Sequence, residues 1–319
     1  DVADSPTGLQ VDLRVPQNED PEGLATPNLR DAVVKLPPGL TVNPSSAAGL
    51  ESCAPGQIWL TTPVGTAPMK TTPGPASCPE GAKIGMVAID TPLLGHPPTG
   101  AVYLAEPYRN PFASLLAIYI AVHDPVSDVV IKLAGQVEIG PEGQLTTSFD
   151  ENPQLPFSSF RLNFFSGARA PLKTPPLCGS YQTTSTMTPW SAPESGPPAG
   201  PADSYSISRS PGPGACPLTP AQQPNAPSFE AGTESPLAGA YSPFLLRLKR
   251  EEGSQRFGSL TATLHPGMLG KLAGVPYCPE AALAAAAARS GAEEQAAPSC
   301  PSASEVGSVN VGAGAGPAP

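Results

Sequence analysis

Apolar and polar residues alternate with a period of two in many short segments of this chain, which is typical of β-strands with one buried face. The clearest segments are residues 9–13, 32–36, 131–139, 145–149 and 160–164, followed by the Ser- and Thr-rich residues 181–187 and 204–208. Residues 115–122 are apolar on both faces and suit a central strand. Turn residues separate the segments, as in Gly140-Pro141-Glu142-Gly143. The pattern predicts an all-β protein built as a β-sandwich.

Two stretches of the chain carry the same features in the same order. The earlier stretch has Leu36-Pro37-Pro38-Gly39-Leu40, Cys53, Cys78-Pro79 and Ile84-Gly85. The later stretch has Leu264-His265-Pro266-Gly267-Met268, Cys278, Cys300-Pro301 and Val306-Gly307. An alternating strand precedes each stretch, with Leu9, Val11 and Leu13 matching Phe244, Leu246 and Leu248. We interpret the likeness as an internal repeat with a period of about 225–235 residues.

The repeat predicts three parts of the chain. Residues 1–220 are a complete β-sandwich unit, here called repeat one, and residues 221–241 are a linker rich in Pro, Ser and Gly. Residues 242–319 are an incomplete second copy, here called repeat two, whose last strand is expected at 306–311. Repeat two lacks counterparts of the later strands of repeat one. We therefore expect its apolar surface to be covered by further chain or by another copy.

Six cysteines lie far apart in the sequence, at Cys53, Cys78, Cys178, Cys216, Cys278 and Cys300. No pair has C-x-x-C spacing, so a zinc site is not expected. An even number at wide spacing indicates three disulfides in an oxidising compartment, and six buried thiols in the cytosol are the alternative. The repeat pairs Cys53 with Cys78 and Cys278 with Cys300, which leaves Cys178 for Cys216.

Short helices are expected inside the cysteine-bracketed segments. Pro279 and Glu280 begin an alanine-rich run, Arg289 stands in its last turn and Gly291 follows, which together predict a helix. Repeat one has a weaker counterpart that begins at Pro55. We expect each helix to be held by its disulfide over the open end of the sandwich.

Composition and charge exclude several classes of protein. The chain has 45 prolines and 32 glycines among 319 residues, and only 14% of its residues are charged, which argues against a coiled coil or helical bundle. A net charge of −10 argues against binding to nucleic acid or to anionic lipid. The longest apolar run is far shorter than the about 20 residues of a membrane-spanning helix. Because residue 1 is Asp, we expect a processed product or a fragment.

No sequence motif for catalysis is present. The chain has no G-x-S-x-G, H-E-x-x-H or P-loop motif, and His96, His123 and His265 stand alone. His123 precedes Asp124, which could make a base, but no nucleophile motif accompanies the pair. We therefore predict no enzyme activity, no catalytic residue, no metal and no cofactor. The acidic run from Asn18 to Glu22 lacks the residue order of a calcium loop, so a solvated loop is the better interpretation.

Two tryptophans and a Ser/Thr/Pro-rich stretch are the candidate positions for contact with glycans or for their attachment. Trp59 and Trp190 are interpreted as packing residues, with a sugar-stacking role as the alternative. The sequence Asn43-Pro44-Ser45 is blocked as an N-glycosylation site by its proline. Residues 183–235 are either O-glycosylated or a bare linker.

The repeat also resembles a family of uncharacterised secreted proteins of soil actinobacteria, which are long and built of tandem repeats. The residues that carry the resemblance are Leu36 to Ser45, Cys78-Pro79 with Ile84-Gly85, Leu155-Pro156-Phe157 and Gly270 to Gly274 before Cys278. The resemblance covers nearly the whole chain and implies an extracellular, multi-repeat protein. In that family a segment like 312–319 is followed by further strands. The family brings no assigned activity.

These observations predict an extracellular structural protein of a cell-surface array or fibre, which associates with copies of itself. An extracellular module that binds carbohydrate or another surface ligand is the alternative, and a secreted hydrolase comes third. Exposed aromatic residues along a groove would favour the binding module. A histidine beside both a carboxylate and a hydroxyl group in a cleft would favour the hydrolase.

Overall fold

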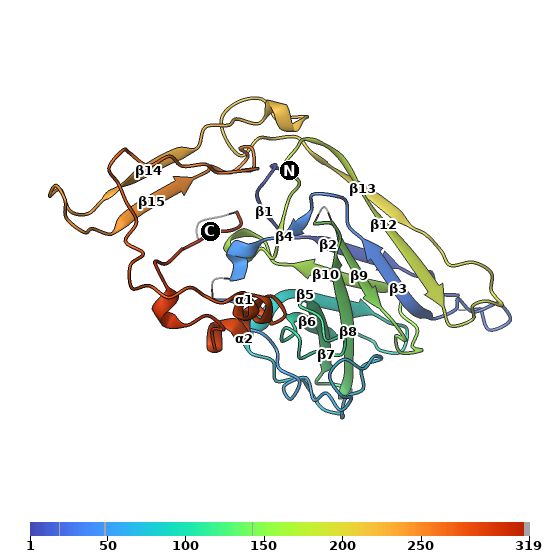
Figure 1. The fold of residues 1–319 in the computed structure, drawn as a ribbon. Coiled ribbons are helices and arrows are strands. Elements are labelled where there is room, and N and C mark those ends of the chain that lie inside the picture. Colours follow the sequence, from blue (N-terminus) through green and yellow to red (C-terminus); the bar gives the residue numbers. More distant parts are fainter. Residues whose placement is uncertain (19, 48, 142, 316–319) are drawn as a thin grey trace. The chain divides into compact units, whose positions relative to one another are not determined.

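The protein is all-β, as the sequence predicts, with two short α-helices near its C-terminal end (Figure 1). The structure is a computed structural model that describes residues 1–18, 20–47, 49–141 and 143–315. Its strands are β1 (Pro6–Thr7), β2 (Gln10–Arg14), β3 (Leu29–Lys35), β4 (Thr41–Val42), β5 (Lys83–Asp90), β6 (Thr99–Leu104), β7 (Ala117–Asp124), β8 (Val129–Ile139), β9 (Leu145–Phe149), β10 (Ser159–Phe164), β11 (Leu172–Lys173), β12 (Gly179–Pro189), β13 (Ala202–Ile207), β14 (Ser228–Thr233) and β15 (Phe244–Lys249). The helices are α1 (Glu280–Ala287) and α2 (Gly291–Ala296).

Ten of these strands form one antiparallel sheet in the order β13-β12-β3-β9-β8-β7-β6-β5-β10-β2. The segment that is apolar on both faces becomes β7, which lies between β6 and β8 well inside the sheet. The predicted hairpin is β8–β9, in which Ile139 pairs with Leu145. Glu142 of its predicted turn lies outside the described residues. A second sheet has the order β1-β11-β4.

The large sheet curls, which brings residues from opposite ends of its strand order together (Figure 1). Leu9, beside β2, and Tyr205 of β13 pack against one apolar cluster that contains Leu172 of β11. On the same concave side, Val87, Ile120 and their neighbours form a second cluster. The strands therefore enclose an apolar interior by curvature of one sheet, where the sequence predicted a sandwich.

The outer face of β7 is covered by the segment between Cys53 and Cys78. Ile58 and Cys53 are fully buried there with Tyr119. Burial, with the nearby charge of Glu106, raises the pKa of Tyr119 to about 12. This segment contains turns over residues 55–59 and no helix, so the helix predicted at Pro55 is wrong. Gly56 favours helix poorly, and Trp59 has a left-handed backbone with φ of 63°, whereas the counterpart α1 is rich in alanine.

Contacts divide the chain at a different place from the predicted boundaries. One compact body holds residues 1–255 and 313–319, and another holds residues 256–312. The predicted linker, 221–241, contains β14. Residues 313–315 return to the large body, where Asn43 Oδ1 accepts a hydrogen bond of 2.9 Å from Ala315 N. The boundary differs because β14 and β15 pair with each other and residues after them bind the large body.

Repeat two forms less regular structure than its sequence predicts. Its first strand is present as β15, but residues 306–311 are not a strand. The counterpart of these residues, β5, is hydrogen-bonded on both sides, by β6 and β10. The described residues of repeat two form no counterpart of β6 or β10, so residues 306–311 pair with no strand there. Helix α2 was not predicted, although Ser290 and Glu293 form its capping box.

Candidate functional site

The three disulfides join the same cysteine pairs that the repeat spacing predicts. They are Cys53–Cys78, Cys178–Cys216 and Cys278–Cys300. The Cα atoms of the two repeated pairs are 4.9 and 5.2 Å apart. Three disulfides are typical of proteins that fold in an oxidising environment.

The turn before each repeated disulfide has the same backbone structure. Leu40 N donates a hydrogen bond of 3.3 Å to Pro37 O, and Met268 N donates one of 3.1 Å to His265 O. The third residue of each turn, Gly39 or Gly267, has φ of 87° or 91°. Proline before such a glycine gives a type II turn. Repeat two therefore has the local conformation of repeat one at this motif.

The residues after the cysteines also match. Ala54 O accepts from Gln57 N and Ile58 N, while Pro279 O accepts from Ala282 N and Leu283 N. After the second cysteine of each pair, a short 3-10 helix follows the proline, at Glu80–Ala82 and Ser302–Ser304. These equivalences make Leu283 the structural counterpart of Ile58.

Equivalent apolar side chains nevertheless have opposite exposure in the two repeats. Four residues of repeat one are buried, namely Leu36, Ile58, Ile84 and Val87, with at most 7% of their surface exposed. Their counterparts are Leu264, Leu283, Val306 and Val309, which are 48–85% exposed. We call these four the open residues of repeat two. The same apolar set is therefore buried in repeat one and exposed in repeat two.

The hairpin β14–β15 is exposed on both faces, and an isolated two-stranded hairpin is marginally stable in water. Phe229 pairs with Leu248, and Arg247 Nη1 lies 3.1 Å from Glu230 Oε2. Within the described residues β15 has no other neighbouring strand.

The hydrogen bonds show which edge of β15 is open. Leu9 O accepts a hydrogen bond from Phe164 N, and Val15 N donates one to Ser158 O. The main-chain N–H and C=O groups of the odd-numbered residues along β2 therefore point toward β10. In the hairpin β14–β15, Pro243 O accepts a hydrogen bond from Glu234 N, so the main-chain groups of the odd-numbered residues of β15 point toward β14. Main-chain groups alternate between the two edges of a strand. The even residues from Phe244 to Leu248, which correspond to Leu9 to Leu13, therefore face the open edge. Among the described residues, no strand pairs with the edge of β15 that corresponds to the edge of β2 bound by β10.

A buried ion pair fixes the chain that follows this hairpin. Asp4 Oδ2 accepts a hydrogen bond of 2.7 Å from Gly253 N, and the other carboxylate oxygen binds Lys173 Nζ. Burial alone would raise the pKa of Asp4, but the hydrogen bond and charge of Lys173, with Gly253 and Arg250, hold it below the ordinary value. The first residues of the chain thereby anchor the region beyond β15.

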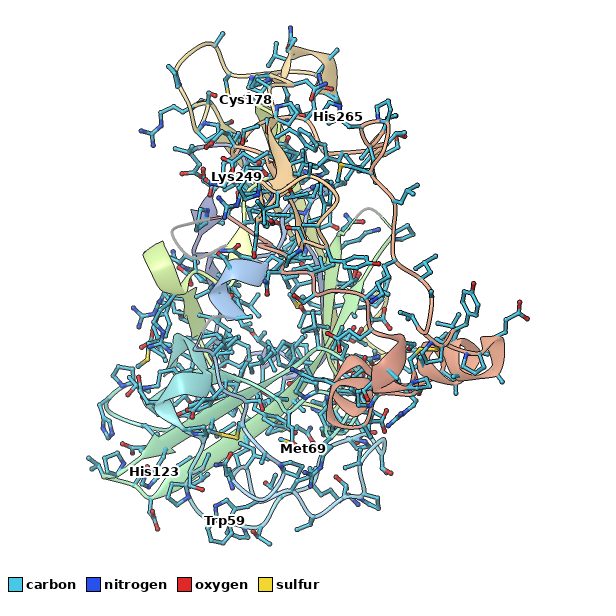
Figure 2. The ribbon with its side chains drawn as sticks, turned by 60° about the vertical axis from the view of Figure 1, so that its left-hand side comes forward. Trp59, Met69, His123, Cys178, Lys249 and His265 are labelled. Carbon is cyan, nitrogen blue, oxygen red and sulfur yellow. A yellow bond between two sulfur atoms is a disulfide. The ribbon has the colours of Figure 1, made fainter. Side chains whose placement is uncertain are left out.

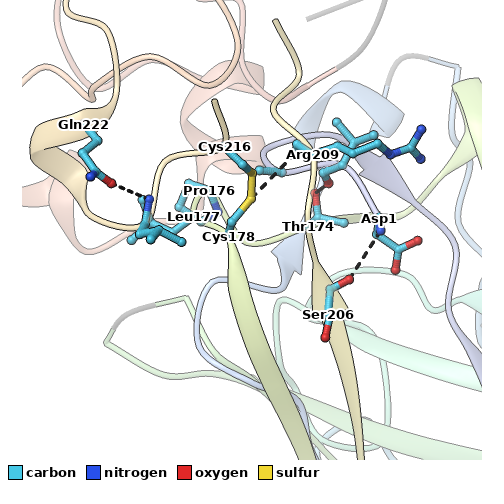
Figure 3. Close-up of a disulfide and its surroundings, with 12 residues drawn as sticks. Asp1, Thr174, Pro176, Leu177, Cys178, Ser206, Arg209, Cys216 and Gln222 are labelled. Carbon is cyan, nitrogen blue, oxygen red and sulfur yellow. Dashed lines mark hydrogen bonds between the residues drawn. A yellow bond between two sulfur atoms is a disulfide. The ribbon is translucent and has the colours of Figure 1, made fainter. Parts of the chain in front are cut away.

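The remaining disulfide closes one end of β12 and β13. Cys178 comes directly before β12, and its N–H donates a hydrogen bond of 2.7 Å to Pro217 O. Beside it, the N-terminal amino group lies 3.4 Å from Ser206 O, as Figure 3 shows. Cys178, Ala3 and Ile207 form a small apolar cluster. The pair therefore ties β12, β13 and the first residues of the chain together.

The three histidines lie in different environments. His96 Nε2 is 2.8 Å from Asp124 Oδ1, and His123 Nε2 is 3.2 Å from Asp128 Oδ1 on the surface. His265 belongs to the exposed turn of repeat two. His96 also lines a small cleft of about 270 Å³ with Gln17, Asp90 and Ser158.

The carboxylate of Asp124 accepts hydrogen bonds from the residues beside His96. The Ser127 hydroxyl group and its N–H both donate to Asp124 Oδ2. The Ser127 side chain and then His96 hold the pKa of Asp124 well below its usual range. His96, which lines this cleft, therefore lies beside a carboxylate that also binds a hydroxyl group, the combination that would favour a hydrolase. A nucleophilic serine must give its proton to the imidazole. Ser127 directs its proton to the carboxylate and not to the imidazole, so these contacts organise the β7–β8 turn and orient the His96 ring.

The other candidates from the sequence use their polar groups locally. In the acidic run, Asn18 Oδ1 accepts from Asp20 N and Asp20 Oδ1 accepts from Glu22 N, both at 3.0 Å, while Glu19 lies outside the described residues. Trp59 is half-exposed on the large body (Figure 2), with Lys132 Nζ 5.9 Å from its ring centre. Trp190 donates to Asn152 O.

Comparisons with protein-family models, with curated proteins and with solved structures find no match to this chain. Within the described residues, no helix has the length and apolar character needed to cross a bilayer. The described His, Cys, Asp and Glu residues form no group of three or more that could hold a metal ion.

Sequence reasoning missed three features of the structure. The pairing of Asp4 with Lys173 joins residues far apart in the chain and has no local signal. The interior cavity described below depends on the curvature of the sheet. The capping box of α2, Ser290 with Glu293, was readable in the sequence.

Proposed function

We propose that this protein is an extracellular structural protein of a cell-surface array or fibre, which assembles through repeated units. The open edge of β15 carries the proposal, because it is the edge on which repeat one binds β10. Strand addition at a free edge is an established mode of protein association. The occupant that the repeat favours is a strand of the β10 type, Ser-Phe-Arg-Leu-Asn-Phe in this chain, from a further copy of the repeat. Because β10 pairs with β2 and β5 in its own molecule, a second molecule would supply it by exchanging the strand, as in domain swapping.

The open residues of repeat two support the same proposal. A β10-type strand in repeat one brings Leu162 into the cluster that buries Ile84 and Val87. The counterparts Val306 and Val309 would be buried in the same way. A contact of this kind joins two different surfaces, so it generates a head-to-tail chain of molecules and not a closed pair. The three disulfides and the resemblance to secreted repeat proteins support an extracellular location.

The experiment measures the mass of the full chain in solution by light scattering at increasing concentration, with electron microscopy of the same samples. We expect masses above the 32.4 kDa of one chain, which grow with concentration. Leu246→Pro removes the N–H that faces the open edge, where proline is tolerated, so it blocks strand addition and keeps the hairpin. Leu246→Val retains the N–H and is the matched control.

Assembly that persists in Leu246→Pro would contradict strand addition at this edge. A second pair of variants tests the open residues. Val306→Ser with Val309→Ser is expected to reduce assembly, whereas Val126→Ser, at a similarly exposed valine outside repeat two, is expected to leave it unchanged. A single chain that stays monomeric at all concentrations would overturn the proposal.

The proposal gives the histidines no catalytic part. Replacing His96, His123 and His265 together by Gln is expected to leave folding and assembly unchanged. Loss of a hydrolytic activity in this variant, with folding retained, would show that the turn around Asp124 does chemistry.

A further inference from the structure

The curled sheet of the large body encloses a cavity of about 590 Å³. Its walls come from the end strand β2, from the middle of the sheet, and from β3 and β12 toward the other end. Representative wall residues are Val11 (β2), Val34 (β3), Ile84 (β5), Ile120 (β7), Val137 (β8) and Phe160 (β10). This volume lies within the range of about 300–1,000 Å³ that is usual for small-molecule pockets.

The walls of this cavity are almost wholly apolar. None of its described lining residues carries a charge, and five have polar side chains, namely Asn43, Ser46, Thr91, Thr147 and Asn152. Four of these five already donate hydrogen bonds to main-chain carbonyl oxygens. The acceptors are Ala170 O for Asn43, Asn43 O for Ser46, Pro156 O for Thr91 and Arg30 O for Asn152. The donors of these side chains therefore serve the protein itself.

An apolar cavity of this size is unfavourable when it is empty. The cost of a cavity rises with its volume, because the side chains that line it lose their packing partners. Water does not relieve the cost, since a buried water needs two to four polar partners. Phe160, Phe164 and Val11 line the cavity and pack against the core, yet they are only partly buried.

Two leucines mark the entrance to the cavity. Leu93 and Leu155 both line it and are 60% and 44% exposed at the surface. They lie on the loops 91–98 and 150–158, which the hydrogen bond from Thr91 Oγ1 to Pro156 O joins. An apolar molecule could therefore enter between these loops without opening the sheet.

We infer that this cavity binds a small apolar molecule of aliphatic character, such as the hydrocarbon chain of an uncharged lipid. The absence of charge among the described lining residues and the occupied donors disfavour sugars, nucleotides and carboxylate groups inside. The branched aliphatic side chains, with Phe149, Phe160 and Phe164, fit a flexible hydrocarbon chain. The inference is independent of assembly through repeat two.

The experiment titrates the full chain with N-phenyl-1-naphthylamine, whose fluorescence rises in apolar surroundings, and displaces it with n-alkanols of increasing length. We expect one saturable site per chain. Each added methylene should tighten alkanol binding about fourfold until the cavity is filled, as expected from the transfer free energy of a CH₂ group. Alkanoates of the same length should bind more weakly at neutral pH, because no described cation faces the cavity.

Val34→Trp places a large side chain in the cavity and partly fills it, and is called the filled variant; Val33→Trp is the matched control on the opposite face of β3. We expect Val34→Trp to weaken probe binding at least tenfold and Val33→Trp to change it little. If Val34→Trp fails to fold by circular dichroism, Val34→Phe replaces it with the same expected direction. Bound alkanol should also raise the thermal midpoint of the wild type by mass action and leave that of the filled variant unchanged.

Several outcomes would overturn the inference. These are a probe that does not bind, affinity that is independent of alkanol length, or equal binding to the folded filled variant. Probe bound only at the exposed apolar residues of repeat two would give equal binding to Val34→Trp and reduced binding to Val306→Ser with Val309→Ser. The two sites are therefore distinguishable.

Discussion

The two cysteine-bracketed segments each have a disulfide and share the hydrogen bonds beside its cysteines, yet their equivalent apolar residues differ in burial. Residues 53–78 lie on the outer face of β7, where Ile58 contributes to a buried cluster. Residues 278–300 form α1 and α2, and Leu283, the counterpart of Ile58, is exposed. Turns and caps thus follow from nearby residues alone. Burial and strand formation require partner strands, and the described part of repeat two contains no counterpart of β6 or β10.

The largest difference between the two segments is expected when their disulfides are removed. Replacing Cys53 and Cys78 by Ala removes a cross-link between residues that are 25 positions apart. The lost restriction of the unfolded chain should lower the free energy of unfolding by about 3.5 kcal/mol. Lost packing of the buried Cys53 adds to this cost. Urea unfolding followed by tryptophan fluorescence measures it, because Trp59 and Trp190 both lie in repeat one.

The matched variant replaces Cys278 and Cys300 by Ala. It should leave the tryptophan transition unchanged, since the large body does not contain this disulfide. Equal shifts of the transition in both double variants would contradict the separation of the two bodies.

A smaller contrast is expected for the equivalent apolar residues. Ile58→Ala leaves a cavity beside Tyr119 and should lower the free energy of unfolding by about 2–4 kcal/mol. Leu283→Ala acts at an exposed helix position and should change it by less than about 0.5 kcal/mol. The same urea titration compares them. A large effect of Leu283→Ala only under conditions of assembly would instead show that assembly buries this residue.

Alanine substitutions at the glycines of the two equivalent turns should differ less in their effect on stability. Both have a positive φ, so an alanine there costs roughly 1–2 kcal/mol of backbone strain. A Cβ at Gly39 would also approach Pro175 Cβ to 3.2 Å, whereas one at Gly267 meets no atom within 4 Å. Gly39→Ala should therefore lower the thermal midpoint of the tryptophan signal, and Gly267→Ala should not move it. A shift with Gly267→Ala would contradict this expectation.

The smallest effect is expected from pH near neutrality. In the folded protein the pKa values of Asp4 and Asp124 lie below the ordinary value of 3.8. Their stabilisation is therefore complete above that value and is lost as the pH falls through the folded pKa. The thermal midpoint of the large body should be flat between pH 8 and 5 and fall below about pH 4.

Asp124→Asn should reduce this acid dependence, because the Asn side chain stays uncharged at every pH of the titration. Asp128→Asn is the control, since the Asp128 side chain is 91% exposed. A midpoint that falls steadily from pH 8 would assign the dependence to other groups.

Much of the strand pattern could be predicted from the sequence, because each strand with one buried face alternates locally. Residues 160–164 and 145–149 illustrate this as β10 and β9. The repeat likewise predicts cysteine pairs that match those in the structure. By contrast, residues 306–311 have the pattern of a strand and form none, because no strand among residues 242–315 pairs with them.

The functional features that the sequence did not predict depend on the course of the whole chain. The cavity requires β2 and β3, which stand at separate places in the sheet order, to curve toward each other. The open edge of β15 becomes visible only when its hydrogen bonds are compared with those of β2. The linker could not be recognised as containing β14, since Ser228 to Thr233 include only one large apolar residue, Phe229.

The strand order also has a consequence for how the chain folds. From β5 to β9 each strand pairs with the next along the chain, whereas β2, β3 and β1 pair with β10, β12 and β11 from a distant part of it. Pairings between distant segments close large loops and slow folding. We expect the β5–β9 meander to form early and the flanking strands to close over it later. The duration of that second stage sets how long the inner apolar face is open to aggregation.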